Sequence, residues 1–213
     1  MNEYCLILSG GDYHGLPEEL QTISPACIIA CDRGWQHAER MGLTPDLVVG
    51  DFDSAPPPSH LPWERVPSRK DDTDTMLAVK EALKRGYRHL ALLCAFGGRL
   101  DHSLANIQAG AYAARRGAAA CLYGADTRGL VSAGPAVHQL PRRDGWSLSL
   151  FSLSERCGGL SLRGTKYDGK NLCLDSSFPL GVSNVWTEDQ AEIAFESGIL
   201  LILESQLKKG EHI

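Results

Sequence analysis

Two aspartates follow a short apolar run near residue 50. The apolar residues 47–49 lead into Gly50-Asp51-Phe52-Asp53-Ser54, so two carboxylates stand two positions apart where a buried strand should end. Residues two apart in an extended chain project to the same face, which would bring Asp51 and Asp53 together. Two like charges so placed favour a bound cation, and a polar turn in which the aspartates accept backbone hydrogen bonds is the alternative.

A second acidic cluster, Lys70-Asp71-Asp72-Thr73-Asp74-Thr75, stands where a helix should begin. Capping and the helix dipole explain one or two acidic residues in a first helical turn, but they do not require three. Asp71 and Asp74 are three apart and can share a helix face, with the Thr73 hydroxyl beside them. With Asp51 and Asp53 they predict an oxygen-only pocket that suits magnesium.

A third signal is the turn Phe96-Gly97-Gly98-Arg99-Leu100-Asp101-His102, which leads into a helix that carries Asn106. Glycines at a strand-to-helix turn let the backbone approach a phosphate, and a helix N-terminus favours an anion. Arg99 adds a planar guanidinium that can hold phosphate oxygens. A plain tight connection, with Asp101 as the helix cap, is the alternative for this segment.

Two further small loops, Ser9-Gly10-Gly11 and Asp32-Arg33-Gly34, also follow predicted strands. Ligands of open α/β sheets collect at the carboxyl ends of the strands. The sequence has no Gly-x-x-x-x-Gly-Lys-Ser/Thr loop, and residues 9–12 lack the full dinucleotide-binding fingerprint. Any nucleotide is therefore expected to bind by another scheme.

The elements that must position these loops alternate between strand-like and helical patterns. Short apolar runs predict strands at 4–8, 27–30, 47–49, 89–96 and 119–123. Amphipathic stretches predict helices at 36–41, 73–84 and 102–116, each with a glycine soon after its end. Such alternation predicts an α/β domain, with a mostly parallel, Rossmann-like sheet covered by helices, over residues 1–125.

Beyond about residue 124 the helical pattern fades and short apolar or alternating runs follow. They predict strands at 146–153, 160–162, 172–174, 191–195 and 199–203, with turn-forming residues between them. We therefore expect an all-β domain of sandwich or barrel type over residues 126–213, with the boundary at 125–128.

Composition excludes several classes of protein. The chain has 213 residues and a formal net charge of -5, without the basic excess of a nucleic-acid binder. No apolar run reaches the roughly 18 residues of a spanning helix, and the first residues lack a basic signal region, so no membrane partner and a cytoplasmic location are expected. Seven scattered cysteines without a Cys-x-x-Cys pair predict reduced and mostly buried thiols.

Taken in order, these segments resemble the thiamine pyrophosphokinase (thiamin diphosphokinase) family. The resemblance rests on Asp32-Arg33-Gly34, Thr44-Pro45-Asp46-Leu47-Val48-Val49-Gly50-Asp51-Phe52-Asp53-Ser54, Lys70-Asp71-Asp72-Thr73-Asp74 and Gly97-Gly98-Arg99-Leu100-Asp101-His102. Two later segments, Gly164-Thr165-Lys166-Tyr167 and Leu180-Gly181-Val182-Ser183-Asn184, look like the thiamine-side motifs of that family. The resemblance therefore covers nearly the whole chain.

The resemblance implies a first domain that binds ATP and Mg²⁺ and catalyses transfer, followed by a β domain for thiamine binding and dimerisation. It implies a homodimer whose active sites lie between subunits. By similarity the catalytic residues are Asp51, Asp53, Asp71, Asp74, Arg99 and Asp101. The implied metal ligands are Asp51, Asp53, Asp71 and Asp74. The implied ATP-binding residues are Gly10, Gly11, Asp32, Arg33, Gly34, Thr73, Arg99, His102 and Asn106. The implied thiamine contacts are Thr165, Tyr167, Ser183 and Asn184.

Several of these residues could have a purely structural role instead. The family often shows Asp-Gly-Gly-Ala where this chain has Asp32-Arg33-Gly34-Trp35, and Trp35 is expected to begin a helix and pack in the core. Tyr167 could be a half-buried strand aromatic, and residues 183–184 could be turn formers. Trp186 could stack on the cationic thiazolium of thiamine.

The implied reaction is attack of the thiamine hydroxyl on the β-phosphorus of ATP, giving thiamine diphosphate and AMP. Asp101 and Asp71 are both candidates to accept the hydroxyl proton. Three alternatives stay open: a haloacid-dehalogenase-like phosphatase that uses residues 51–54, a diphosphotransferase acting on a pterin alcohol, and a sensor that binds ATP or thiamine without turnover.

Overall fold

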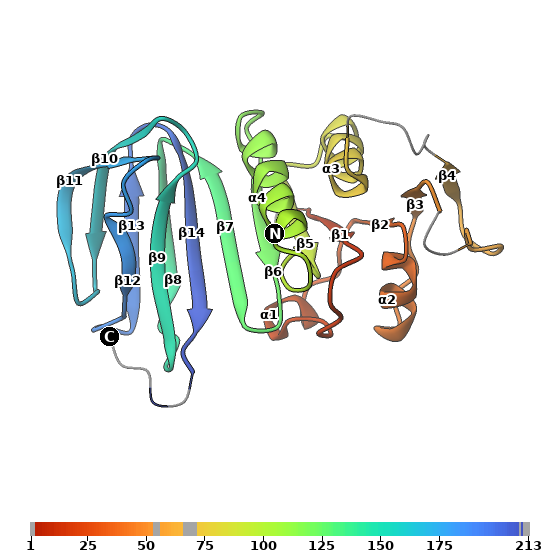
Figure 1. Ribbon diagram of the computed structural model, residues 1–213, viewed down its shortest axis with the longest axis horizontal. Coiled ribbons are helices and arrows are strands. Elements are labelled where there is room, and N and C mark those ends of the chain that lie inside the picture. Colours follow the sequence, from red (N-terminus) through yellow and green to blue (C-terminus); the bar gives the residue numbers. More distant parts are fainter. Residues whose placement is uncertain (1–2, 53–55, 66–71, 209, 211–213) are drawn as a thin grey trace. The chain divides into compact units, whose positions relative to one another are not determined.

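The computed structural model describes residues 3–52, 56–65, 72–208 and 210. The chain divides into two compact units, Met1–Ala125 and Asp126–Ile213 (Figure 1). Asp53, Lys70 and Asp71 lie outside the described residues.

The strands described in the first unit pair in parallel. They are β1 (Cys5–Leu8), β2 (Cys27–Cys31), β3 (Leu47–Gly50), β4 (Trp63–Arg65), β5 (His89–Leu93) and β6 (Ala119–Tyr123), in the spatial order β4-β3-β2-β1-β5-β6. From β1 the chain moves outward to β4 and then crosses back to β5 on the other side of β1. The strand order therefore reverses between β1 and β5, which is where open α/β sheets bind their ligands.

The central strands are apolar along their whole length. Every residue of β1 and β2 is buried, as is every residue of β5 after His89. Parallel strands covered on both faces need such continuous apolar runs, in place of the alternation typical of a strand with one wet face. These strands therefore form a fixed base for the loops at their carboxyl ends.

Four helices, among the described residues, connect these strands: α1 (Glu18–Gln21), α2 (Gly34–Arg40), α3 (Asp74–Lys84) and α4 (Leu100–Ala114). Thr73 caps α3, and its Oγ1 accepts a hydrogen bond from the Met76 backbone N at 3.1 Å. Gly86 follows α3 with φ 94° and Gly117 follows α4 with φ 75°. The predicted ends of α3 are thus confirmed within one residue, whereas α4 begins two residues before the predicted His102.

The second unit consists of antiparallel strands in two sheets. Its strands are β7 (Thr127–Ala133), β8 (Ala136–Pro141), β9 (Trp146–Ser152), β10 (Arg156–Arg163), β11 (Gly169–Asp175), β12 (Gly181–Asn184), β13 (Gln190–Phe195) and β14 (Ile199–Gln206). One sheet has the order β12-β9-β14-β7 and the other β11-β10-β13-β8. Buried side chains from both sheets, such as Leu150 and Ile202 from one and Leu160 and Ile193 from the other, form a shared core.

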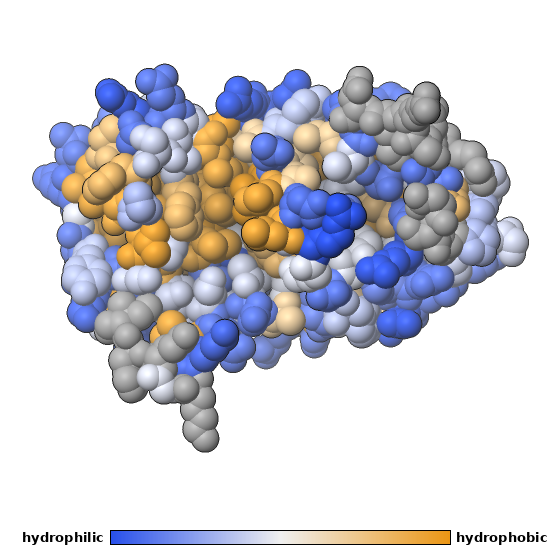
Figure 2. Space-filling view, viewed as in Figure 1, coloured by the Kyte–Doolittle hydropathy of each residue, from blue (hydrophilic) through white to orange (hydrophobic). Residues whose placement is uncertain are grey.

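An α/β unit is therefore followed by an all-β unit, and parallel and antiparallel pairs both occur in the chain. The Rossmann-like description of the first unit stays a prediction. Figure 2 shows apolar surface gathered over strands of the second unit. Near β12, the side chains of Phe178, Leu180 and Val182 are 65%, 55% and 44% exposed.

All seven cysteines are described, and all are free thiols. Five are buried, as predicted, but Cys173 is exposed. In the part of the chain that the structure describes, no helix is both long and apolar enough to cross a membrane.

Candidate active site

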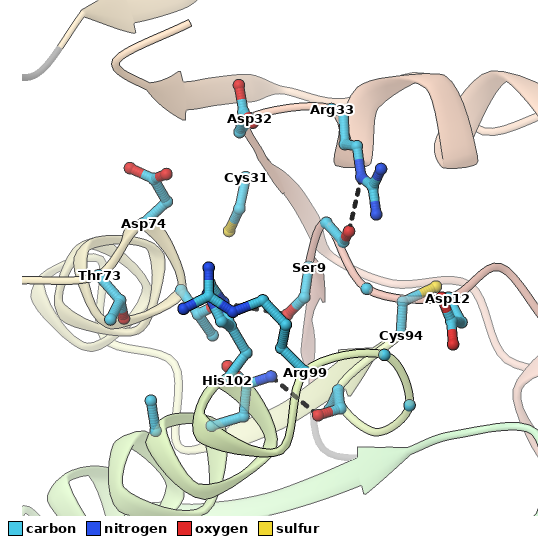
Figure 3. Close-up of a pocket in the computed structure, with 18 of the residues that line it drawn as sticks. Ser9, Asp12, Cys31, Asp32, Arg33, Thr73, Asp74, Cys94, Arg99 and His102 are labelled. Atoms are coloured by element: carbon cyan, nitrogen blue, oxygen red, sulfur yellow. Dashed lines mark hydrogen bonds between the residues drawn. The ribbon is translucent and has the colours of Figure 1, made fainter. Parts of the chain in front are cut away.

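A cleft of about 490 Å³ lies at the carboxyl ends of the strands where the strand order of the first unit reverses (Figure 3). It receives residues that follow β1, β2, β3 and β5 and residues from the first turns of α3 and α4. The lining residues are Ser9, Gly10, Gly11, Asp12, Cys31, Asp32, Arg33, Asp51, Thr73, Asp74, Thr75, Cys94, Ala95, Gly97, Gly98, Arg99, His102, Ala105 and Asn106. We call this set the cleft.

Glycines allow the loops of the cleft to approach one another. A Cβ on Gly11 would lie 2.2 Å from the Cys94 carbonyl oxygen, so only glycine fits beside that strand end. A Cβ on Gly34 would lie 2.3 Å from the Leu8 carbonyl oxygen, which lets α2 begin directly against β1. Gly34, predicted to bind ATP, is outside the lining set and acts through this close packing.

One side of the cleft is acidic. Asp32 follows β2, Asp51 follows β3, and Asp74 opens α3 beside the cap residue Thr73. The Asp32 backbone N–H donates to the Val49 carbonyl at 2.7 Å, which ties the end of β2 to the end of β3. Figure 3 shows the carboxylates of Asp32 and Asp74 at the same side of the cleft.

These donors are carboxylate and hydroxyl oxygens, which is the chemistry that magnesium prefers. Asp51 and Asp74 both line the cleft, whereas Asp53 and Asp71, the other two predicted ligands, lie outside the described residues. Within the described ranges, no group of three or more His, Cys, Asp or Glu side chains is arranged to hold a metal ion. The donor types fit magnesium, and the complete ligand set stays a prediction.

Two arginines provide the positive charge of the cleft. The Arg33 Nε donates to the Gly10 carbonyl at 2.7 Å, so the guanidinium is fixed at the loop that follows β1. Arg99 forms a two-point ion pair with Asp101, with Nε–Oδ1 at 3.1 Å and Nη2–Oδ2 at 2.5 Å. This ion pair lowers the pKa of Asp101 and raises the pKa of Arg99. Asp101 lies outside the lining set. Its carboxylate accepts hydrogen bonds from the Arg99 guanidinium and from the His102 backbone N–H.

Buried polar side chains support the cleft from below. Asn106 is 6% exposed, and its Nδ2 donates to the Ala95 carbonyl at 2.8 Å, which joins α4 to the end of β5. The Ser9 and Thr75 hydroxyls share a hydrogen bond of 3.2 Å between β1 and α3. Nε2 of His37 lies 3.0 Å from the Gly11 carbonyl, and burial lowers the pKa of this histidine.

Sequence reasoning missed several lining residues. Asp12, Cys31, Thr75, Cys94 and Ala105 were not assigned to a site. Asp12 directly follows the Gly10-Gly11 loop, which is a signal that could have found it. The two cysteines instead look like the ends of apolar strands, and burial raises the pKa of Cys94 to about 11.

In the second unit, the structure brings two predicted thiamine-side segments together. Asn184 is 6% exposed, and its amide holds Tyr167 from both sides: Oδ1 accepts from the Tyr167 N–H at 3.0 Å and Nδ2 donates to the Tyr167 carbonyl at 3.1 Å. Asn184 Nδ2 also donates to Thr165 Oγ1, which in turn donates to Asp168 Oδ1, each at 3.0 Å. We call Thr165, Tyr167, Asp168 and Asn184 the asparagine cluster.

Of the predicted thiamine contacts, Tyr167 and Ser183 are exposed: Tyr167 is 58% exposed, and Ser183 has φ 62°. The proposed stacking role of Trp186 is wrong. Trp186 is 6% exposed, packs in the core of the second unit, and donates its Nε1–H to the Leu140 carbonyl at 3.2 Å. A large aromatic surface gains more from this burial than an exposed position would allow. Trp35 packs on the core of the first unit, as predicted.

Comparison with known proteins gives matches in both units. Residues 21–122 match the family model described as "Thiamin pyrophosphokinase, catalytic domain", and residues 137–200 match "Thiamin pyrophosphokinase, vitamin B1 binding domain". Together the two matches cover more than half of the chain.

Relatives agree with these matches over nearly the full length. A thiamine pyrophosphokinase of Bacillus subtilis is 25% identical over 208 residues, which cover 93% of this chain and 97% of the relative. The crystal structure of thiamine pyrophosphokinase from Bacillus subtilis shares the fold with a TM-score of 0.82 at 24% identity, covering 96% and 99% of the two chains. The structure from Geobacillus thermodenitrificans has a TM-score of 0.78 at 26% identity, covering 95% and 97%. The chain is an enzyme of the thiamine diphosphokinase kind (EC 2.7.6.2) and belongs to the thiamin pyrophosphokinase family.

Proposed function

We propose that this enzyme transfers a diphosphate group from ATP to the primary hydroxyl of thiamine and releases AMP. The observation that carries the proposal is the cleft, which is lined by carboxylates from three strand or helix ends and by two guanidinium groups at the point where the strand order reverses. Family membership supports the substrate assignment, because both matched models are those of thiamin pyrophosphokinase domains.

Magnesium would be held on the acidic side of the cleft by Asp51 and Asp74, with Asp53 and Asp71 as further expected ligands. When bound, magnesium would supply positive charge that offsets the negative charge developing on the oxygen of the leaving AMP. Carboxylates without a cation would repel the ATP phosphates, so this side of the cleft requires a counter-charge.

The residues of the chain itself would position the phosphates. Backbone N–H groups at residues 10–11 and 97–98 can approach an anion closely, because those positions carry no side chain. Arg33 and Arg99 would hold phosphate oxygens from two different loops with planar guanidinium groups. Transfer of this kind depends mainly on positioning and electrostatic stabilisation, which fits a cleft lined by carboxylates, guanidinium groups and glycines.

The contacts of Asp101 favour a positioning role. Its carboxylate is occupied by Arg99, and the same ion pair lowers its pKa, which makes it a weaker proton acceptor. We therefore assign Asp101 to the orientation of Arg99, and Asp71 stays the candidate for accepting the hydroxyl proton.

The second unit would provide the thiamine contacts. Tyr167 and Ser183 are exposed and available to a ligand, while Thr165 and Asn184 are buried and hold Tyr167 in place. We further propose a homodimer whose active sites lie between subunits. The exposed apolar side chains of Phe178, Leu180 and Val182 support an association surface on this unit.

A product assay tests the function directly. The purified protein is incubated with ATP, magnesium and thiamine, and AMP and thiamine diphosphate are followed together by chromatography, with each component omitted in turn. Equal amounts of the two products are expected. Release of free phosphate without AMP would favour the phosphatase alternative, and AMP formed only when a pterin alcohol replaces thiamine would change the acceptor. Binding of ATP without any product would favour the sensor.

A further inference from the structure

A second pocket, of about 330 Å³, lies at the opposite ends of the two helices that open into the cleft. It is lined by Lys80, Leu83, Lys84, Arg88, Tyr112 and Arg116, and we call it the basic pocket. These residues come from the C-terminal half of α3, from the last turn of α4 and the residues just after it, and from the loop before β5. None of them belongs to the lining set of the cleft, among the residues that the structure describes.

Positive charge is concentrated in the basic pocket. Its described lining residues include four cations and no carboxylate, in a chain whose formal net charge is -5. Two of these cations have acidic partners outside the lining set: Lys80 contacts Asp72 at 2.6 Å, and Lys84 contacts Glu81 at 3.5 Å. The basic pocket therefore keeps an excess of positive charge.

The other two cations bind only uncharged acceptors within the described residues. Arg88 Nη1 donates to the carbonyls of Leu83 and Tyr87 at 3.3 and 3.0 Å, and Arg116 Nη1 donates to the Tyr112 carbonyl at 3.2 Å. Cations commonly cap helix C-termini, and one at each helix end would satisfy that role. Capping does not explain four cations around one hollow.

An aromatic ring fixes the geometry of the cations. The Arg116 guanidinium carbon lies 3.4 Å from the centroid of the Tyr112 ring, and Lys80 Nζ lies 5.7 Å from it. Stacking on the ring orients the planar guanidinium and leaves its edge nitrogens to bind an acceptor. The cations therefore converge on one hollow from two helices and a loop.

Lys80 connects the basic pocket to the cleft. Its partner Asp72 directly precedes Thr73, the cap of α3, and Asp74, and both of these residues line the cleft. An anion that binds Lys80 would compete with Asp72 for its ammonium group. The segment that opens α3 would then lose one of its contacts.

We propose that the basic pocket binds the diphosphate group of a small anion, and that this binding draws Lys80 away from Asp72 and lowers turnover. A diphosphate offers oxygens at both of its ends and can reach the cations of α3 and the arginine just after α4 together, which a single phosphate does less well. The existence of this site does not depend on the proposed function. Only the effect on turnover rests on the proposed function.

Hydrogen–deuterium exchange with inorganic pyrophosphate as the probe, at constant ionic strength, tests the site without requiring turnover. Protection is expected in peptides covering 80–88 and 112–117. The paired change Lys84→Gln and Arg116→Gln should weaken this binding by roughly tenfold or more, because charged contacts to phosphate are lost. Arg115→Gln is the matched control, since Arg115 is an exposed neighbour outside the basic pocket. Unchanged exchange in these peptides, or an equal loss of protection in the control, would overturn the site.

Thiamine diphosphate in place of pyrophosphate separates the two sources of a diphosphate group. Protection by both compounds indicates that the basic pocket accepts esters, and protection by pyrophosphate alone restricts it to the free anion.

Turnover at saturating ATP and thiamine, with free magnesium held constant, tests the coupling. Pyrophosphate should inhibit the unmodified enzyme more than the Lys84→Gln/Arg116→Gln variant, whose basal turnover should be unchanged. Equal inhibition of the two proteins would place the effect in the cleft and overturn the coupling. If pyrophosphate protects these peptides but the enzyme never forms AMP, the site is supported and the proposed function is wrong.

Discussion

The cleft of the first unit contains residues predicted from their spacing, whereas Thr165, Tyr167 and Asn184 of the asparagine cluster were implied by the family resemblance. The two regions use their polar groups differently. In the cleft, Asp51, Asp74 and Arg33 lie on the lining surface, where a ligand can reach them. In the asparagine cluster, the amide of Asn184 is fully engaged with Thr165 and Tyr167. A motif residue can therefore act by direct contact or by holding another residue in place, and the two roles respond differently to mutation.

The largest expected effect is on the acidic side of the cleft. Asp51→Asn should lower kcat/KM by roughly 100-fold or more. The substitution removes a negative charge that would hold magnesium, and magnesium would offset the negative charge that develops on the leaving oxygen. Half-buried Asp51 contributes to the site more than to the core, so the thermal midpoint should change little. Steady-state kinetics and a thermal melt measure both, with exposed Asp144→Asn as control. Near-normal activity would remove Asp51 from the metal site.

Substitutions of Arg33 and Arg99 should affect different kinetic constants. Arg33→Gly introduces the smaller residue that the family often has, and it should raise the KM for ATP by about tenfold while the KM for thiamine stays unchanged. Arg99→Ala should lower kcat as well, and Asp101→Asn should reproduce part of that loss by releasing Arg99. Kinetics at varied ATP measure these changes. If Asp101→Asn were more damaging than Arg99→Ala, the positioning role of Asp101 would be wrong.

Variants of the asparagine cluster should distinguish residues that stabilise the fold from residues that bind thiamine. Asn184→Ala should reduce the free energy of unfolding by about 2–3 kcal/mol, because buried partners lose their hydrogen bonds. Tyr167→Ala removes an exposed side chain and should change stability by about 0.5 kcal/mol or less, while raising the KM for thiamine. Urea unfolding and kinetics on both variants test this contrast. Equal losses of stability would mean that Tyr167 also serves the fold.

The smallest effect concerns buried or partly buried histidines in both units. Burial lowers the pKa of His14 and His37 in the first unit and of His138 in the second. The unfolded chain therefore binds more protons than the folded protein below the ordinary histidine pKa of about 6.5. Stability should be greatest above that pH and should fall as the pH drops toward the folded pKa values. Urea unfolding at pH 7.5 and 5.5 measures the change, and His138→Asn should reduce it. Greater stability at pH 5.5 would contradict the direction of these shifts.

The sequence was most informative where local patterns decide the structure. The cap at Thr73 and the apolar strands before Asp32 and Asp51 could be found because capping chemistry and continuous apolar runs are local properties. The shared placement of Asp51, Asp74 and Arg99 in one cleft needed more than these local features: it followed from the rule that ligands of open α/β sheets collect at the carboxyl ends of the strands, and from the family resemblance.

Features that depend on distant partners were missed. β7 (Thr127–Ala133) contains Arg128, Gly129 and Ser132, so its sequence lacks strand alternation, and it forms because it pairs with β14 along its whole length. β8 pairs with β13 and has exposed positions that weaken its apolar pattern. The burial of Trp186 likewise depends on strands far away in the chain.

The most direct test of the central claim uses ATP labelled separately at the α- and γ-phosphates. The enzyme is incubated with thiamine and magnesium, and the label in each separated product is counted. Attack at the β-phosphorus predicts that all α-label appears in AMP and all γ-label in thiamine diphosphate. Label from the γ-phosphate in a monophosphate ester, with ADP as the second product, would contradict diphosphate transfer.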